Sequence, residues 1–263
     1  MSCYKLLNVT LLLTYFNGSS FIHSSQIEIE RRMTAQVEDI HTALTFTDLT
    51  TVHYLHTDPY GLVNAYITLI PIAIAVGAIT LFIFRRDLRT AAVFAGLVFS
   101  ESVNYVLKKT IKENRPDAYD GLIKGKHSYG MPSSHSQFMF FFSTLVTLFI
   151  IKNRINFKHS TSLLTIPFLY TVSAMVAYSR YHLYYHTLKQ VLFGSLVGIS
   201  LGPIWYFVIE FILVPYIFPI VINNPIGRYF YLRDTSSIHN LMEFEYTNAT
   251  KEIQRLKNTK KNK

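Results

Sequence analysis

The sequence has a single cysteine, Cys3, among its 263 residues. This excludes an internal disulfide framework and any zinc site built from cysteines. Acidic side chains are also scarce, since no Asp or Glu occurs between Asp120 and Glu210. The HExxH pattern of zinc proteases is absent, and Mg²⁺ prefers oxygen ligands, largely carboxylates. The central part of the chain therefore offers no local carboxylate for metal binding or for general-base catalysis.

Charge of either sign is uncommon as well. Charged residues make up 16% of the chain and hydrophobic residues 50%, with a formal net charge of +9. Residues 61–84 form a 24-residue run without any charge, and about 20 apolar residues cross a bilayer as a helix. Further runs of this kind occupy residues 90–107, 137–151, 162–178 and 191–214. The pattern predicts an all-α fold, a polytopic transmembrane bundle of about five spans.

We expect three parts along the chain. Residues 1–57 form an N-terminal arm, residues 58–222 a membrane-embedded domain, and residues 223–263 a basic cytosolic tail. The apolar run at residues 6–16 is too short to cross a membrane. It is either the hydrophobic region of a signal peptide within residues 1–20 or part of a disordered extension.

The orientation in the membrane follows from the loops and the C-terminus. The short basic loops at 84–89 and 152–159 favour the cytosolic side. The lysine-rich loop after the second span carries the same sign, which conflicts with this unless its lysines bind a ligand. The C-terminal KKNK is similar to the dilysine retrieval signal of endoplasmic reticulum membrane proteins, which is read from the cytosol. With five spans, a cytosolic tail places segments 108–134 and 180–190 in the lumen.

Three polar islands interrupt the apolar chain. The first is KKTIKENRP, in which Lys108 and Arg115 are seven positions apart and so lie on nearly the same face of a helix. Charged residues at such a position usually face the bundle interior or a water-filled cavity. The alternative is that both side chains simply reach toward the membrane surface.

The second island is GMPSSHSQF. Pro132 suits the first turn of a helix, and Ser133 and Ser134 suit its cap. The free N–H groups of a helix start, beside His135, form a ready anion site. A plain helix cap with an incidental histidine is the alternative interpretation.

The third island is YSRYHLYYHTLKQ. Arg180 and His186 are six positions apart, so they converge only if a turn separates them. His182 and His186 have the spacing of a metal-binding pair, but no neighbouring carboxylate supports that interpretation. The whole set fits phosphoryl transfer: cations and amides hold the phosphoryl group, one histidine attacks phosphorus, and the other protonates the leaving oxygen.

Together the islands resemble the type 2 phosphatidic acid phosphatase superfamily, which also includes the vanadium haloperoxidases. The family pattern is K-x6-RP, then PSGH, then SR-x5-H-x3-D. Residues 108–116 match the first motif fully, and residues 132–135 match the second with Ser134 in the glycine position. Residues 179–186 match the third, but Gln190 stands where aspartate is usual.

The resemblance implies a role for each matching residue. His186 would be the nucleophile that forms a phosphohistidine, and His135 the general acid. Gln190 would orient His186 by accepting its ring N–H, without adding negative charge. No metal and no other cofactor is implied. The residues that would bind the phosphoryl oxygens are Lys108, Arg115, Ser133, Ser134 and Arg180.

Three stretches, GMPSSHSQF, YHTLKQV and LRDTSS, look like the dolichyl diphosphatase branch of this superfamily. That branch removes the terminal phosphate of dolichyl diphosphate on the lumenal side of the endoplasmic reticulum membrane. The reaction recycles the lipid carrier of protein N-glycosylation. The resemblance implies a polyprenyl diphosphate substrate in a membrane, and no nucleic-acid partner. The preferred polyprenol length and the oligomeric state stay open.

Other functions fit the composition. The first is a phosphatase for another lipid phosphate, such as phosphatidate, a sphingoid base phosphate or a different isoprenoid diphosphate. The second is a lipid-binding membrane protein without catalysis, although both histidines are present. The third, a small-solute transporter, is disfavoured because we find no inverted repeat and no paired broken helices.

Overall fold

The computed structural model describes Val52, Tyr54 and residues 58–116, 129–152, 159–235, 237–238 and 241–261, without the side chains of 159–163, 242 and 261. The described residues belong to one compact unit, Val52–Lys263. The signal peptide expected within residues 1–20 lies outside the described residues, as does almost all of the arm at 1–57.

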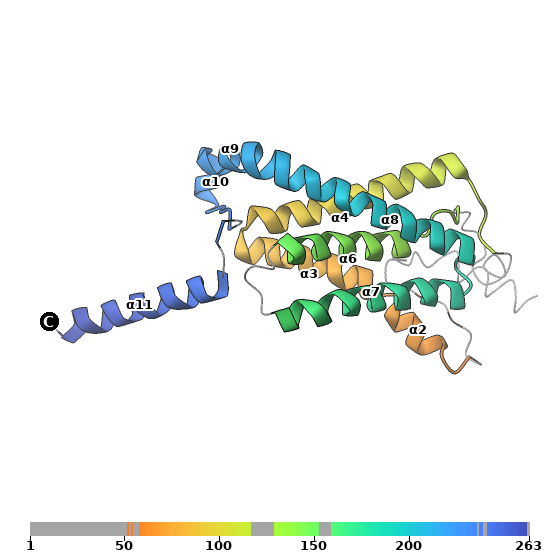
Figure 1. Ribbon diagram of the computed structural model, residues 1–263, viewed down its shortest axis with the longest axis horizontal. Helices are drawn as coiled ribbons and strands as arrows, with labels where there is room; N and C mark the ends of the chain where they lie inside the picture. Colours follow the sequence, from red (N-terminus) through yellow and green to blue (C-terminus); the bar gives the residue numbers. More distant parts are fainter. Residues whose placement is uncertain are drawn as a thin grey trace, which may run out of the picture. The chain divides into compact units, whose positions relative to one another are not determined.

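The described chain is all-α, as expected from the sequence, and contains no β-strand. One isolated parallel bridge pairs Asp87 with Arg233. The helices, shown in Figure 1, are α2 (Gly61–Ile67), α3 (Ile70–Arg85), α4 (Leu88–Ile111), α6 (Ser134–Lys152), α7 (His159–His182), α8 (Leu188–Val208), the π-helix η2 (Ile209–Ile217), α9 (Phe218–Asn223), α10 (Pro225–Tyr229) and α11 (Leu241–Lys261).

Four helical segments of the described chain are long and apolar enough to cross a membrane: Gly61–Arg85, Leu88–Ile111, Ser134–Lys152 and Leu188–Asn223. Helix α7 has 24 residues, so at 1.5 Å per residue it is about 36 Å long and exceeds the ~30 Å hydrocarbon layer. It leads the chain back from the end of α6 to the start of α8 and packs beside both helices. The polytopic bundle predicted from the sequence is confirmed.

The last segment, Leu188–Asn223, is helical without a break, although it contains Pro203 and Pro215. A proline removes one backbone hydrogen bond and crowds the preceding turn. Pro215 lies inside the π-helical stretch η2, where the wider turns absorb this disturbance. The helix therefore continues to Asn223 instead of ending at either proline.

Helices α6 and α8 touch along a line of small residues. Gly194, Gly198 and Gly202 recur every four positions on α8. A Cβ atom on Gly198 would lie 2.3 Å from the carbonyl oxygen of Gln137, and one on Gly194 would lie 2.6 Å from that of Ser133. Such spacing lets helix backbones approach closely in a membrane. This contact places the start of α8 against the start of α6.

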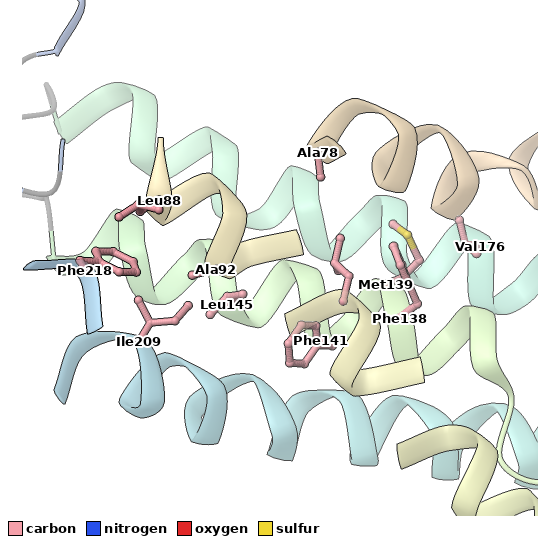
Figure 2. Packing of buried hydrophobic residues seen from close by; sticks show 11 residues of the cluster. Ala78, Leu88, Ala92, Phe138, Met139, Phe141, Leu145, Val176, Ile209 and Phe218 are labelled. Carbon is pink, nitrogen blue, oxygen red and sulfur yellow. The ribbon is translucent and has the colours of Figure 1, made fainter. Parts of the chain in front are cut away.

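Buried apolar side chains fill the space between the helices. Phe141 and Leu145 of α6 lie in this cluster with Val176 of α7 and Ile209 of η2 (Figure 2). Because lipid is as apolar as these side chains, close packing and hydrogen bonds hold the helices together more than removal from water does.

One buried polar contact fixes α4 against α6. Asn104 Nδ2 donates to Gln137 Oε1 at 2.8 Å, and Gln137 Nε2 donates to the carbonyl oxygen of Ser100 at 2.7 Å. Both amide side chains are almost fully buried, so each would be costly to leave without a partner. The contact fixes the position of α4 along α6, and so the position of Lys108, which lies one turn after Asn104.

The other end of the bundle holds a cluster of charges. Glu210 of η2 pairs with Arg89 of α4 and with Lys152 of α6. Asp87 caps α4 by accepting the N–H of Thr90 and also accepts the hydroxyl of Thr235 at 2.7 Å. The LRDTSS stretch and the loop between α3 and α4 therefore meet at this end.

Candidate active site

Four helix ends meet at the opposite end of the bundle: the C-terminal ends of α4 and α7 and the N-terminal ends of α6 and α8 (Figure 1). The eight candidate residues lie on these ends or in the turns beside them: Lys108, Arg115, Ser133, Ser134, His135, Arg180, His186 and Gln190.

A turn after α7 brings Arg180 and His186 together. Tyr184 has a φ of 59°, which reverses the chain as residues at helix C-termini commonly do. The N–H groups of Tyr185 and His186 then both donate to the carbonyl oxygen of Arg180, at 3.1 and 3.2 Å. This is the turn that the sequence required for convergence of the two residues.

Helix α8 begins directly after His186 with a capping box. Thr187 Oγ1 accepts the N–H of Gln190 at 3.3 Å, and Gln190 Oε1 accepts the N–H of Thr187 at 3.2 Å. A Thr cap followed three residues later by Gln is a common start signal of a helix. The box holds Gln190 one turn below His186, on the same side of the chain.

The ring of His186 is oriented by two acceptors. Its Nδ1 lies 2.9 Å from the carbonyl oxygen of Gly130 and 3.3 Å from Oε1 of Gln190. A carbonyl oxygen only accepts, so Nδ1 carries the proton and Nε2 keeps its lone pair in the neutral ring. His186 is 2% exposed and Gln190 is fully buried. The arrangement leaves the lone pair of the neutral ring on Nε2.

The amide of Gln190 is itself fixed by its neighbours. Its Nε2 donates to the carbonyl oxygen of Asn114 at 2.7 Å and to Oε1 of Glu113 at 3.1 Å. Because Nε2 faces two acceptors while Oε1 faces the N–H of Thr187, the amide has one orientation that satisfies all partners. Oε1 therefore accepts from the His186 ring.

Glu113 brings a carboxylate to the site. Because no Asp or Glu occurs between Asp120 and Glu210, the sequence predicts no local carboxylate for metal binding or for general-base catalysis, and it does not predict a carboxylate beside Gln190. The first island itself contains Glu113, and the fold brings its carboxylate to Gln190 across 77 positions of the chain. Its other oxygen accepts from Lys189 Nζ at 2.9 Å, and this partner lowers the pKa of the Glu113 carboxyl group.

The two arginines are held by contacts that no sequence motif indicated. Arg180 lies over the ring of Tyr185, with 3.9 Å between Cζ and the ring centroid, and donates to Thr68 Oγ1 at 3.2 Å. The hydroxyl of Thr68 is also 2.9 Å from that of Ser179. Arg115 donates to the carbonyl oxygen of Tyr185 at 3.2 Å. Both guanidinium groups are thus held in place by neighbouring residues.

Ser133 lies immediately before α6. Its carbonyl oxygen accepts the N–H of Gln137, its own N–H donates to the carbonyl oxygen of Gln190 at 3.1 Å, and its side chain is fully buried. The first N–H groups of α6, from Ser134 onward, have no acceptor within the helix. They give this end a positive dipole next to His135.

Burial and the nearby positive charges of Arg180, Arg115 and Lys108 lower the pKa of His186 well below its usual 6.5. Both effects penalise the imidazolium form. The ring is therefore neutral at pH 7.

His182 does not join this group. Its Nε2 lies 2.7 Å from the carboxylate of Asp58. Within the described residues, no group of three or more His, Cys, Asp or Glu side chains could hold a metal ion.

Comparison with known proteins shows the family of the chain. A family model described as the PAP2 superfamily matches residues 89–212. Dolichyldiphosphatase 1 of Dictyostelium discoideum is 60% identical over 224 residues, which cover 85% of this chain and 97% of that protein. Dolichyldiphosphatase 1 of Homo sapiens is 40% identical over 209 residues, covering 76% of this chain and 85% of that protein.

Among solved structures, a transmembrane PAP2 type phosphatidylglycerolphosphate phosphatase from Bacillus subtilis has the same fold, with a TM-score of 0.50 and 22% identity. The match covers 62% of this chain and 84% of that chain. The chain belongs to the PAP2 superfamily, in its dolichyldiphosphatase branch, which confirms the resemblance inferred from the motifs.

Proposed function

We propose that this protein hydrolyses the terminal phosphate of dolichyl diphosphate, giving dolichyl phosphate and inorganic phosphate. The observation that carries the proposal is the oriented, neutral imidazole of His186, whose Nε2 is free to attack while Nδ1–H is bound to Gly130 and Gln190. The relatives named dolichyldiphosphatase, from an amoeba to mammals, support the choice of a polyprenyl diphosphate as substrate.

The first step forms a phosphohistidine. His186 Nε2 attacks the terminal phosphorus, a P–N bond forms, and the bridging P–O bond breaks with its electron pair leaving on dolichyl phosphate. His135 donates a proton to the leaving oxygen. The ring of His186 becomes positively charged, and the acceptors at its Nδ1–H stabilise that charge.

The second step releases phosphate. A water molecule attacks the phosphorus of the phosphohistidine, and His135, now neutral, takes the proton of that water. The P–N bond breaks and its electron pair returns to Nε2 of His186. Inorganic phosphate leaves, and both histidines are back in their starting states.

The charged oxygens of the phosphoryl group need a set of donors that is already in place. We assign this role to the cations Lys108, Arg115 and Arg180, to the Ser133 hydroxyl and to the backbone N–H of Ser134. These residues lie on α4, α6 and α7 or directly beside their ends, and α6 packs against both α4 and α7. The site derives its charge stabilisation from side chains and amides, and the proposal includes no metal or other cofactor.

For the location, we propose the endoplasmic reticulum membrane with the site facing the lumen. The site and the cluster of Arg89, Lys152 and Glu210 lie at opposite ends of the helices. A cytosolic KKNK tail after the last span then leaves the site on the lumenal side. The proposal includes a membrane domain at residues 58–222 and a cytosolic tail at residues 223–263.

The test is phosphate release by the purified protein in detergent with EDTA present, from dolichyl diphosphate, dolichyl phosphate and phosphatidate in parallel. We expect fast release from dolichyl diphosphate and slow or no release from the other two lipids. Preference for phosphatidate would contradict the assigned substrate and leave a phosphatase of another lipid phosphate. Release from none of them, with EDTA or with added Mg²⁺, would leave a non-catalytic lipid-binding protein.

A further inference from the structure

We propose that Glu113 is a positioning residue for the reaction, acting on His186 through the side-chain amide of Gln190. The inference rests on the proposed function, because it assigns a role in the attack by His186. It follows from one chain of contacts: Glu113 Oε1 is 3.1 Å from Gln190 Nε2, and Gln190 Oε1 is 3.3 Å from His186 Nδ1.

An amide can transmit the effect of a carboxylate. When the Glu113 carboxylate accepts the N–H of Gln190, it draws positive charge toward Nε2 and increases the negative charge on Oε1 of the same amide. Hydrogen bonds in such a chain polarise one another in a low-dielectric interior. Gln190 is fully buried, whereas the Glu113 side chain is 29% exposed, so the contact at His186 is shielded from water and the outer end at Glu113 is only partly shielded. The negative charge that aspartate would supply at position 190 is therefore present one residue further out.

The other charges around His186 make this carboxylate important. The helices and loops packed against the His186 ring carry more basic side chains than acidic ones near it. A phosphorylated, positively charged ring in such surroundings needs a compensating negative charge, and Glu113 is the carboxylate in contact with the group that orients the ring. The titratable and charged groups that face the site are Lys108 and Glu101 of α4, Arg115 after α4, His135 of α6, Arg180 of α7 and Lys189 of α8.

Lys189 provides a matched control. It binds the second oxygen of Glu113 at 2.9 Å, and its side chain is 72% exposed. A surface ion pair of this kind contributes little to stability. Lys189→Ala removes a partner of Glu113 but leaves the contact between Glu113 and Gln190, so we expect its kcat to stay within about twofold of the wild type.

The central experiment exchanges the two side chains. Glu113→Gln removes the negative charge at the outer end of these contacts. We expect kcat to fall roughly tenfold with KM nearly unchanged, as for other groups that orient a reacting ligand. In Gln190→Asp a second carboxylate faces that of Glu113 and the donor to Asn114 is lost, so activity also falls. The double variant, Glu113→Gln with Gln190→Asp, has the carboxylate at position 190 and the amide at position 113. It therefore restores one carboxylate paired with one amide. We expect the double variant to be more active than either single variant.

The pH profile separates positioning from a structural role. Without the negative charge the imidazolium is less stable, so the pKa of His186 falls and the acid limb of kcat/KM moves to lower pH in Glu113→Gln. In the double variant the negative charge lies nearer to the His186 ring and stabilises the imidazolium. The pKa of His186 therefore rises, and the acid limb of kcat/KM moves to higher pH. NMR titration of the His186 ring signal, assigned with His186→Ala, gives the same shifts without turnover and so remains informative if the substrate is another lipid.

Two results would overturn the proposal. One is a double variant whose activity equals the product of the two single losses, with an unshifted titration of His186. The other is a loss in Lys189→Ala as large as that in Glu113→Gln, which would make Glu113 a structural tether. If Glu113→Gln does not fold, Glu113→Asp, which keeps the charge but moves the carboxylate away from Gln190, tests the contact, and the double variant still tests the exchange of charge. An incorrect substrate assignment would be recognised separately, because the wild type would then release phosphate from a different lipid.

Discussion

The carbonyl oxygen of Gly130 lies 2.9 Å from Nδ1 of His186, and this contact decides which ring nitrogen carries the proton. A backbone carbonyl cannot change its role from acceptor to donor, so the proton stays on Nδ1 and the lone pair on Nε2. Gly130 is itself held in place, because its N–H donates to the carbonyl oxygen of Glu113 at 2.7 Å. The loop that follows α4 and the loop that precedes α6 thus orient a histidine that follows α7.

Gly130→Ala tests this arrangement. A Cβ atom there would lie 2.6 Å from Oε1 of Gln190, nearer than atoms can approach, so either the carbonyl or the amide must move. We expect kcat to fall roughly tenfold or more, since misplacing a reacting group by about 1 Å is costly. Gly77→Ala is the matched control, because no atom lies within 4 Å of its added Cβ. Equal activity of the two variants would show that His186 does not depend on this contact.

His135→Ala tests the general acid. Dolichyl phosphate is a good leaving group, whereas the alkoxide released from a phosphate monoester needs a proton in the transition state. On a monoester that the wild type hydrolyses slowly but measurably, we expect a rate loss of about 10²-fold or more, and on dolichyl diphosphate a clearly smaller loss. Phosphate release from both lipids by the same preparation measures the ratio, and equal losses on the two lipids would speak against proton donation by His135.

The lowered pKa of His186 sets an expectation for pH. In the proposed mechanism the neutral ring is the reactive form, so lowering its pKa below 6.5 keeps Nε2 unprotonated to a lower pH. We expect the acid limb of kcat/KM that belongs to this ring to lie below pH 6.5, since kcat/KM reports the free enzyme. NMR titration of the His186 ring separates this limb from ionisation of the substrate. A ring pKa above 6.5 would contradict the prediction.

Gly198→Leu tests the contact between α6 and α8. The first added atom would lie 2.3 Å from the carbonyl oxygen of Gln137, and overpacking of this kind typically costs about 1–3 kcal/mol. We expect a lower midpoint of thermal unfolding in detergent, together with lower activity because Ser133 is carried on the same interface. The exposed Gly77 of α3 offers the control substitution Gly77→Leu, for which we expect an unchanged midpoint.

The sequence predicted much of this molecule because the signals are local. A helix that crosses a bilayer needs a long apolar run, and each polar island coincides with the end of such a run. The order of the motifs and their internal spacing then identified the superfamily. The capping box of Thr187 and Gln190 is equally local, because a Thr followed three residues later by Gln is a start signal of a helix.

The contacts between islands could not be predicted in the same way. Gly130, Glu113 and Thr68 reach the site through loops and helix ends that are far from His186 or Arg180 in the chain. No residue pattern marks a backbone carbonyl as an acceptor for a distant ring. The contact between Glu113 and Gln190 was missed for the same reason, because the two residues are 77 positions apart in the chain.

The most direct test of the central claim is to trap the intermediate. The wild type would be mixed with dolichyl diphosphate labelled in its terminal phosphate, quenched in alkali within the first turnover, and the position of the label determined by peptide mapping and ³¹P NMR. We predict a phosphohistidine at position 186 with phosphorus on Nε2, and no label in His186→Ala. Phosphate on Nδ1, a label on any other residue, or rapid turnover by His186→Ala would contradict the mechanism.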